Sequence, residues 1–248
     1  NNTTDFNTLS GWATNRDGTG SNPPNLNNSR RLVVQNGHTK NTSASASINR
    51  LTIENGGTVT GNHPITFGGG SAQFVIEDGG TYIHDNTANV SSTIFNGTEV
   101  FSSESNFQID RWQSSGTSVT PAGLTRAVSS SIDGNNYFYG NLIINWEGSG
   151  NWNQVWPSYP TATYLTAGDF IINAVGDFRF SQNNNAQPDV YVAGNFTMNS
   201  TGAGNNILNF SSGNNCVGYL NVNGNVVHSN GTITASTTSS YGYIWTYG

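Results

Sequence analysis

The chain has 248 residues, of which only 9% are charged, and its eight Lys and Arg residues against 14 Asp and Glu residues give a formal net charge of −6. So few basic residues exclude general electrostatic binding to nucleic acid or to another polyanion. Hydrophobic residues make up 34% of the chain and aromatic residues 11%. Because they fall in short alternating runs, we expect an ordered, β-rich protein.

Residues 1–30 carry none of the strand pattern that begins after them, and they contain the turn-rich sequence GSNPP. The first strand of a repeat array leaves an unpaired edge, which natural proteins usually cover. We therefore predict that residues 1–30 form an N-terminal capping segment. The opening sequence NNTTDFNTLSGW has no signal-peptide pattern. No apolar run approaches the ~20 residues of a membrane span, so we expect no membrane insertion.

A first repeated phrase follows, with the copies LVVQNGHT, LTIENGGT and FVIEDGGT beginning at Leu32, Leu51 and Phe74. The first and third residues of each copy are apolar. Side chains at positions i and i+2 of a strand lie on one face, so each copy predicts a short strand with one face in a core. The Asn-Gly or Asp-Gly pair that ends the phrase predicts a turn.

The phrase lapses over residues 101–139, although apolar residues such as Phe107, Ile109 and Trp112 remain available as anchors. We expect irregular coils within the same domain over this range.

A second phrase recurs as GNLIIN, GDFIIN, GNFTMN and GNVVHS, beginning at Gly140, Gly168, Gly194 and Gly224. The residue two places after each glycine is predicted to face a common core, and these residues form a column of Leu142, Phe170, Phe196 and Val226. Three copies end in Asn145, Asn173 and Asn199. An asparagine at the end of a strand tolerates a sharp corner, and stacked amides can hydrogen-bond from one coil to the next.

Between Gly168 and Gly224 the chain reads as three short strands per repeat, twice over. A period of 20–30 residues with variable filler is typical of a solenoid. We therefore predict an all-β fold: a right-handed parallel β-helix with about three short strands per coil, over residues 31–238. The handedness follows from the crossover preference of parallel strands. Hairpin sheets are the alternative, but hairpins recur every ~8 to 12 residues and preserve no such phrase.

The stretch 146–164 is an aromatic loop in the predicted β-helix, and it holds three of the six tryptophans. Flat indole and phenol rings stack on sugar rings, and nearby polar groups bind hydroxyls. The residues of this tentative glycan-binding site are Trp146, Glu147, Trp152, Trp156, Tyr159 and Tyr164. The alternative, which we favour, is that the loop folds back and buries its rings along the flank of the rod.

Acidic residues are scattered, and the sequence predicts no catalytic residues and no enzyme. Glu54 and Glu77 occupy equivalent positions of successive copies, which indicates a solvated face. A β-helical polysaccharide lyase or glycosidase is a third hypothesis, because a carboxylate pair about 5 Å apart could serve glycoside hydrolysis. The four histidines have no metal-ligand spacing. Calcium is the cofactor that the sequence leaves open, since Asp78 and Asp85 lie near backbone carbonyls.

The tail at residues 239–248 belongs to a stretch without charge from Gly231 to Gly248, yet it carries Tyr241, Tyr243 and Trp245. The last coil of a solenoid exposes unpaired backbone unless something covers it. We expect either a C-terminal cap, which we favour, or a continuation into a strand that abuts the next module of a longer polypeptide or a neighbouring subunit.

The sequences DFNTLSGWATNRDGTGSNPPNL, VVQNGHT and LTIENGGTVT, with the GN-apolar phrases after them, resemble the β-solenoid regions of large secreted cell-surface proteins, of adhesin or gliding type, exported by bacterial type IX secretion. The resemblance implies an extracellular or cell-surface location and a non-catalytic structural or adhesive role. It implies as partners the neighbouring modules of a longer polypeptide, surface glycans and the type IX secretion machinery. The tail resembles no secretion-sorting domain, so we expect a fragment of a longer protein.

Overall fold

The computed structural model describes residues 4–27, 30–68, 72–86, 98–111, 137–146, 151–152, 163–180, 184–202, 206–210, 213–235 and 239–247. Its elements are η1 (Leu9–Gly11), a single 3-10 turn, and the strands β1 (Arg31–Val34), β2 (Thr39–Asn41), β3 (Ala46–Ile48), β4 (Arg50–Ile53), β5 (Thr58–Gly61), β6 (Ile65–Phe67), β7 (Gln73–Ile76), β8 (Thr81–Asp85), β9 (Thr98–Phe101), β10 (Asn106–Arg111), β11 (Asn141–Asn145), β12 (Asn151–Trp152), β13 (Thr163–Thr166), β14 (Phe170–Ala174), β15 (Asp177–Arg179), β16 (Asp189–Val192), β17 (Phe196–Asn199), β18 (Ile207–Asn209), β19 (Val217–Val222), β20 (Val226–Asn230), β21 (Thr232–Thr234) and β22 (Tyr241–Thr246).

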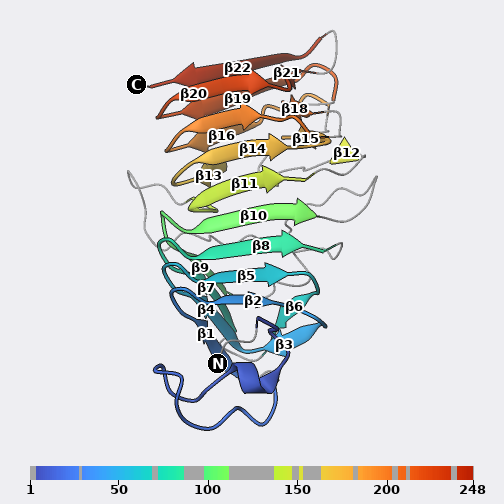
Figure 1. Cartoon of the computed structure of the whole chain (residues 1–248). Coiled ribbons are helices and arrows are strands. Elements are labelled where there is room, and N and C mark those ends of the chain that lie inside the picture. The colour runs from blue at the N-terminus through green and yellow to red at the C-terminus, as the bar shows by residue number, and fades with distance from the viewer. Residues whose placement is uncertain are drawn as a thin grey trace.

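Among the described residues, every pairing of these strands is parallel. One long sheet, β2-β5-β8-β10-β11-β14-β17-β20, runs the length of the molecule (Figure 1). Beside it lie the N-terminal sheet β1-β4-β7-β9, the C-terminal sheet β13-β16-β19-β22, and two further sheets, β3-β6 and β12-β15-β18-β21. The prediction of an all-β chain with parallel strands is confirmed.

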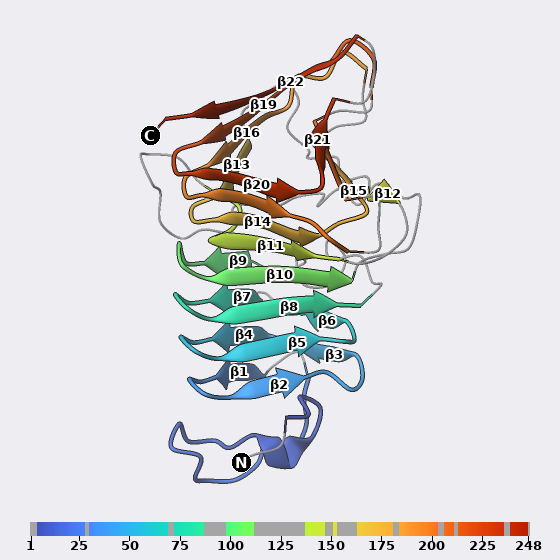
Figure 2. The same cartoon turned by 45° about the horizontal axis from the view of Figure 1, so that its top comes forward.

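Apart from β10 and β11, which pair in the long sheet, described strands that follow one another in sequence belong to different sheets. β14, β15 and β16 lie in three sheets, and β17 then returns to pair with β14 in the long sheet. The same cycle continues with β18, β19 and β20, and Figure 2 shows the returning strands stacked above one another. The three strands read from the sequence between successive copies are therefore present, and antiparallel hairpins are absent from the described residues.

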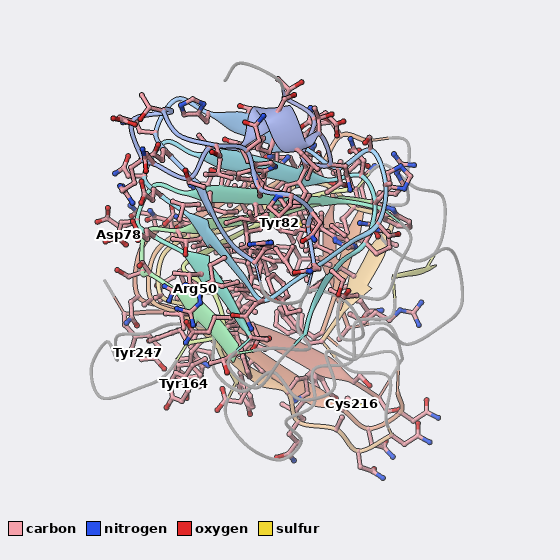
Figure 3. All side chains as sticks on the ribbon, turned by 90° about the horizontal axis from the view of Figure 1, so that it is seen from below. Arg50, Asp78, Tyr82, Tyr164, Cys216 and Tyr247 are labelled. Carbon is pink, nitrogen blue, oxygen red and sulfur yellow. The ribbon has the colours of Figure 1, made fainter. Side chains whose placement is uncertain are left out.

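The predicted inward column is present in the long sheet. Leu142 pairs with Phe170, Phe170 with Phe196, and Phe196 with Val226. The first three are at most 1% exposed, and Val226 is partly buried against the same core. In the N-terminal half the column continues through Lys40, Val59, Tyr82 and Phe107. Tyr82 accordingly lies in the interior when the molecule is viewed from below (Figure 3).

The segment 101–139 is more regular than expected where it is described. Asn106–Arg111 form β10, which pairs with β8 on one side and with β11 on the other. In these six residues Phe107 and Ile109 alternate with polar residues and continue the buried face, and the register with β8 shifts between Ile109 and Arg111. Trp112 lies outside the described residues.

The second residue of the repeated Gly-Asn or Gly-Asp phrase forms a ladder across the coils. The side-chain Oδ1 of Asn141 accepts the backbone N–H of Asp169 at 2.7 Å. Asp169 Oδ1 accepts the N–H of Asn195 at 2.7 Å, and Asn195 Oδ1 accepts that of Asn225 at 2.9 Å. The stacked amides expected at the strand ends occur only in part, as Asn230 Nδ2 donates to Asn199 Oδ1 at 2.6 Å. The fuller ladder therefore lies at the strand starts.

The glycine of each phrase is required by the coil beneath it. A Cβ added to Gly194 would lie 2.5 Å from the backbone C and O atoms of Gly168. One added to Gly224 would lie 2.7 Å from the Gly194 carbonyl oxygen. Real Cβ atoms do not approach backbone so closely, so a side chain here would push two coils apart. This explains why glycine recurs at that point of the phrase.

We expect Gly194→Ala to lower the free energy of unfolding by about 1–3 kcal/mol, the usual cost of forcing extra atoms into a packed site. Urea denaturation followed by far-UV circular dichroism measures the change. Gly18→Ala is the control for steric crowding. A Cβ at Gly18 would meet nothing within 4 Å, so only the positive φ of 80° at this residue opposes the substitution. An unaltered denaturation midpoint for Gly194→Ala would contradict the close approach of the coils.

The described part of the capping segment lies against the first strands, at the lower end of Figure 1. Asp5 forms a parallel bridge with Asn41 at the end of β2. Phe6 and Trp12 are buried, and Trp12 Nε1 donates to the carbonyl of Phe6 at 2.8 Å. Lys40, which opens the inward column, donates from Nζ to the carbonyl of Gly11 at 2.9 Å and lies 5.0 Å from the Trp12 ring centroid. The segment thus supplies a partner for a buried cation.

Candidate glycan-binding face

The structure places the residues of the tentative glycan-binding loop unequally. Trp146 is 6% exposed and belongs to the main core, because it continues the inward alternation of Leu142 and Ile144 past the end of β11. A buried indole cannot stack on a sugar, so for Trp146 the structure agrees with the favoured alternative, in which the rings are buried. For Trp152 the structure describes the backbone in β12 but not the side chain. Glu147, Trp156 and Tyr159 lie outside the described residues.

Tyr164 is the remaining member, and it lies on the outer face of the C-terminal sheet. In each strand of this sheet alternate residues point into the core, among them Leu165, Val190 and Leu220. The residues between them point outward. The side chains of this aromatic face are Tyr164 on β13, Tyr191 on β16, Tyr219 on β19, Tyr241, Tyr243 and Trp245 on β22, and Tyr247 just after it.

The strand register brings these rings together from distant parts of the chain. Tyr164 pairs with Tyr191, and their ring centroids lie 4.9 Å apart. Tyr219 pairs with Tyr243, and their rings stack at 5.5 Å with an interplanar angle of 17°. Viewed along the stack of strands, Tyr164 and Tyr247 lie on the same side of the molecule (Figure 3). Between β16 and β19 the register pairs Tyr191 with Asn221 and Asp189 with Tyr219, so the rings form two pairs that adjoin polar side chains.

The upper part of the aromatic face is open to solvent. Tyr243 is 45% exposed, Trp245 52%, and Tyr241 and Tyr247 both 59%. All six residues of β22 are exposed, and within the described ranges β22 pairs only with β19. The described part of the tail, expected to be a cap or a continuation, is thus a further strand of the sheet. Its aromatic residues point outward from the sheet instead of lying across the end of the core.

Four side chains of this face form a hydrogen-bonded polar group. Asp189 accepts hydrogen bonds from Asn221 Nδ2 at 2.7 Å and from the Tyr191 hydroxyl at 3.1 Å. The Tyr247 hydroxyl donates to Asn221 Oδ1 at 3.1 Å. Burial, followed by the negative charge of Asp189, raises the pKa of Tyr191 to about 12. The phenol therefore stays neutral and keeps donating, while lone pairs of the Asp189 carboxylate remain for a further donor such as a sugar hydroxyl.

The other acidic residues considered from the sequence are engaged elsewhere. Glu54 forms an ion pair with Arg16 at 2.6 Å. Asp78 Oδ1 accepts the backbone N–H of Glu104 at 3.1 Å, and Asp85 is paired with Arg111 at 2.9 Å. Within the described ranges no group of three or more His, Cys, Asp or Glu side chains could hold a metal ion. The structure offers no support there for the calcium site that the sequence leaves open.

Comparisons with protein-family models, with curated proteins and with solved structures found no match to this chain. No helix in the described part of the chain is long and apolar enough to cross a membrane. Function is therefore inferred from the geometry of the aromatic face, from the arrangement of the strands and from the composition.

Proposed function

We propose that the chain is a right-handed parallel β-helix that serves as a non-catalytic adhesive module of a secreted bacterial surface protein or filament, and that its aromatic face binds glycans. The open, tyrosine-rich outer surface of the C-terminal sheet carries this proposal. Contiguous exposed apolar patches often mark interaction sites, and four aromatic side chains of this face are 45–59% exposed.

The β-helix is supported by the path of the chain. Three sheets are visited in turn, and each strand pairs in parallel with one in the next repeat. Connections between parallel strands of one sheet are right-handed in about 98% of cases, which supports the handedness. A rod in which each coil contacts only its neighbours suits a structural or adhesive module of a longer polypeptide.

The choice of a glycan as ligand is supported by chemistry. Phenol and indole rings present flat apolar faces with polar tips, and a sugar ring offers C–H groups on its face and hydroxyls on its edge. The Asp189, Asn221 and Tyr247 side chains supply directional hydrogen bonds beside the rings. The extracellular or cell-surface location is supported by a composition of uncharged polar residues with a single lysine, Lys40, and by the resemblance noted above. The type IX machinery enters as a partner through that resemblance alone.

We expect Trp245→Ala to weaken binding of a glycan by about tenfold, which is the upper range for a stacked aromatic pair. The experiment screens neutral and acidic oligosaccharides against the full chain and measures the best of them by isothermal titration calorimetry. Because Trp245 is exposed, the Trp245→Ala variant should have the same thermal unfolding midpoint as the parent.

Val227→Ala is the matched control, since Val227 is 47% exposed on β20 but belongs to the long sheet. Equal losses for the two variants, or no binding by any oligosaccharide, would remove the aromatic face as a glycan site. Depolymerisation of a polysaccharide by the purified chain would instead favour the lyase or glycosidase hypothesis.

A further inference from the structure

A cavity of about 610 Å³ lies at the N-terminal end, opposite the aromatic strand β22. One wall is formed by residues 11–18 of the capping segment, and the other by residues 30–35, which include β1. We call this space the cap groove. Its volume is in the range of ordinary ligand sites, and no step of the glycan proposal uses it.

The cap groove gathers positive charge in an acidic protein. Four of the eight Lys and Arg residues of the chain line it, namely Arg16, Arg30, Arg31 and Lys40, and Asp17 is the single acidic residue of the lining. The net charge of the whole chain is −6. A cleft lined by one sign of charge concentrates ligands of the opposite sign, so the groove suits an anion.

The four cations are not equally available. Lys40 donates a hydrogen bond to the Gly11 carbonyl and lies over the Trp12 ring, and Arg16 is paired with Glu54. Arg30 uses its Nε to donate to Asn25 Oδ1 at 3.3 Å, which leaves its two terminal nitrogens. Arg31 is exposed, and within the part of the chain that the structure describes it makes no side-chain hydrogen bond or ion pair. Arg30 and Arg31 are thus the groups that can receive carboxylates.

The groove also runs along an open strand edge. Among the strands that the structure describes, β1 is the terminal strand of its sheet and pairs only with β4. The carbonyls of Arg30 and Val34 accept N–H groups of Arg50 and Glu54 on that side. Backbone groups alternate between the two edges of a strand, so the N–H and C=O groups of Arg31 and Val33 point the other way. An extended peptide can pair with such an edge.

We propose that the cap groove binds an extended acidic peptide segment of a partner protein, which adds as a strand to the open edge of β1 and places carboxylates on Arg30 and Arg31. Trp12 is only 7% exposed and lies beneath the Lys40 ammonium, so it presents no free ring for a sugar. The open edge, in contrast, offers backbone donors and acceptors in the spacing of a peptide. These two observations favour a peptide over an acidic sugar.

The test uses fluorescence polarisation with the full chain and a labelled pentapeptide of alternating Asp and Val. Two matched probes accompany it: one with Lys in place of Asp, and one acidic peptide with alternate backbone nitrogens methylated. We expect the acidic probe to bind. The Lys probe should fail to bind, because it lacks the carboxylates that accept charge-assisted hydrogen bonds from arginine. N-methylation should weaken binding about tenfold, because it removes backbone hydrogen bonds to β1.

Arg31→Gln should weaken the acidic probe about tenfold. Arg111→Gln, which removes an exposed arginine on β10, should leave binding unchanged, as should Trp245→Ala. Circular dichroism establishes that each variant is folded. No binding by the acidic probe, equal binding of its N-methylated form, or equal losses in the two arginine variants would overturn the proposal. Tighter binding of an oligogalacturonate with the same dependence on Arg31 would reassign the groove to an acidic sugar. None of these outcomes bears on the aromatic face.

Discussion

Replacing Phe196 with alanine is expected to lower the free energy of unfolding by about 3–5 kcal/mol, the range measured for truncating buried phenylalanines. Phe196 is fully buried in β17. Its ring lies 5.5 Å from that of Phe170 in the coil below, and its strand partner in the coil above is Val226. Because both neighbours are held by their own strands, the cavity cannot collapse fully. The denaturation midpoint in urea measures the loss.

Thr197→Ala provides the control in the same strand. Thr197 follows Phe196, points to the outer face and is only partly buried, so its replacement should change stability by about 0.5 kcal/mol or less. Similar midpoints for the two variants would show that the inward column does not carry the stability of this sheet.

Glu99 is expected to make the stability of the protein depend on pH. It pairs with Phe74 at the inward position that Leu32, Leu51 and Phe74 occupy in the preceding strands of the N-terminal sheet. Its side chain is 2% exposed, and neither carboxylate oxygen has a hydrogen-bond partner among the described residues. Burial is the largest cause of the shift, and it raises the pKa of this carboxyl from 4.5 to about 7.

The direction of the pH effect follows from this raised pKa. Between pH 4.5 and about 7 the folded chain keeps the Glu99 proton, whereas the unfolded chain has released it. The free energy of unfolding therefore falls as the pH rises from 4.5 towards 7. Above about pH 7 it stays roughly 3 kcal/mol lower than below pH 4.5. Glu99→Leu, which continues the apolar column, removes this titration, so its stability relative to the parent should rise by roughly 3 kcal/mol between pH 4 and pH 8.

Urea midpoints of the parent and of Glu99→Leu between pH 4 and pH 8 check this expectation. The difference between the two curves isolates Glu99 from the other titrating groups. Glu104→Gln removes an exposed carboxylate from the following turn, so it should leave the pH profile of the parent in place. A constant difference between parent and Glu99→Leu across the whole range would show that the carboxyl is not buried as described.

Alternation and repeated phrases were enough to predict the strands and the Leu142, Phe170 and Phe196 column, because strand period and burial are local properties. The inward positions of Lys40 and Glu99 could not be predicted in this way. A charged residue reads as outward in any pattern, and only the register with Val59 and Phe74 places these two inside.

The aromatic face was missed for a different reason. Its members lie in separate coils, and the coils differ in length, so their alignment depends on how each connection closes. A signal was nevertheless present. Tyrosines stand at Tyr137, Tyr164, Tyr191, Tyr219 and Tyr243, an interval close to that of the glycine phrase. The prediction concentrated on tryptophans within one loop, and Trp146, which directly follows β11, continues the inward alternation into the core.

The parallel stacking of coils also determines how the molecule would respond to mechanical force. The N-terminal segment and β22 lie at opposite ends of the stack (Figure 1), so tension between them acts across the backbone ladders one coil at a time. The coil from Gly168 to Gly194 adds about 4.8 Å of length while folded, but its chain spans roughly 90 Å when drawn out. Each coil that detaches would therefore release a large extension and leave the next ladder intact, so that the rod would lengthen in steps and dissipate a sudden load before the whole fold is lost.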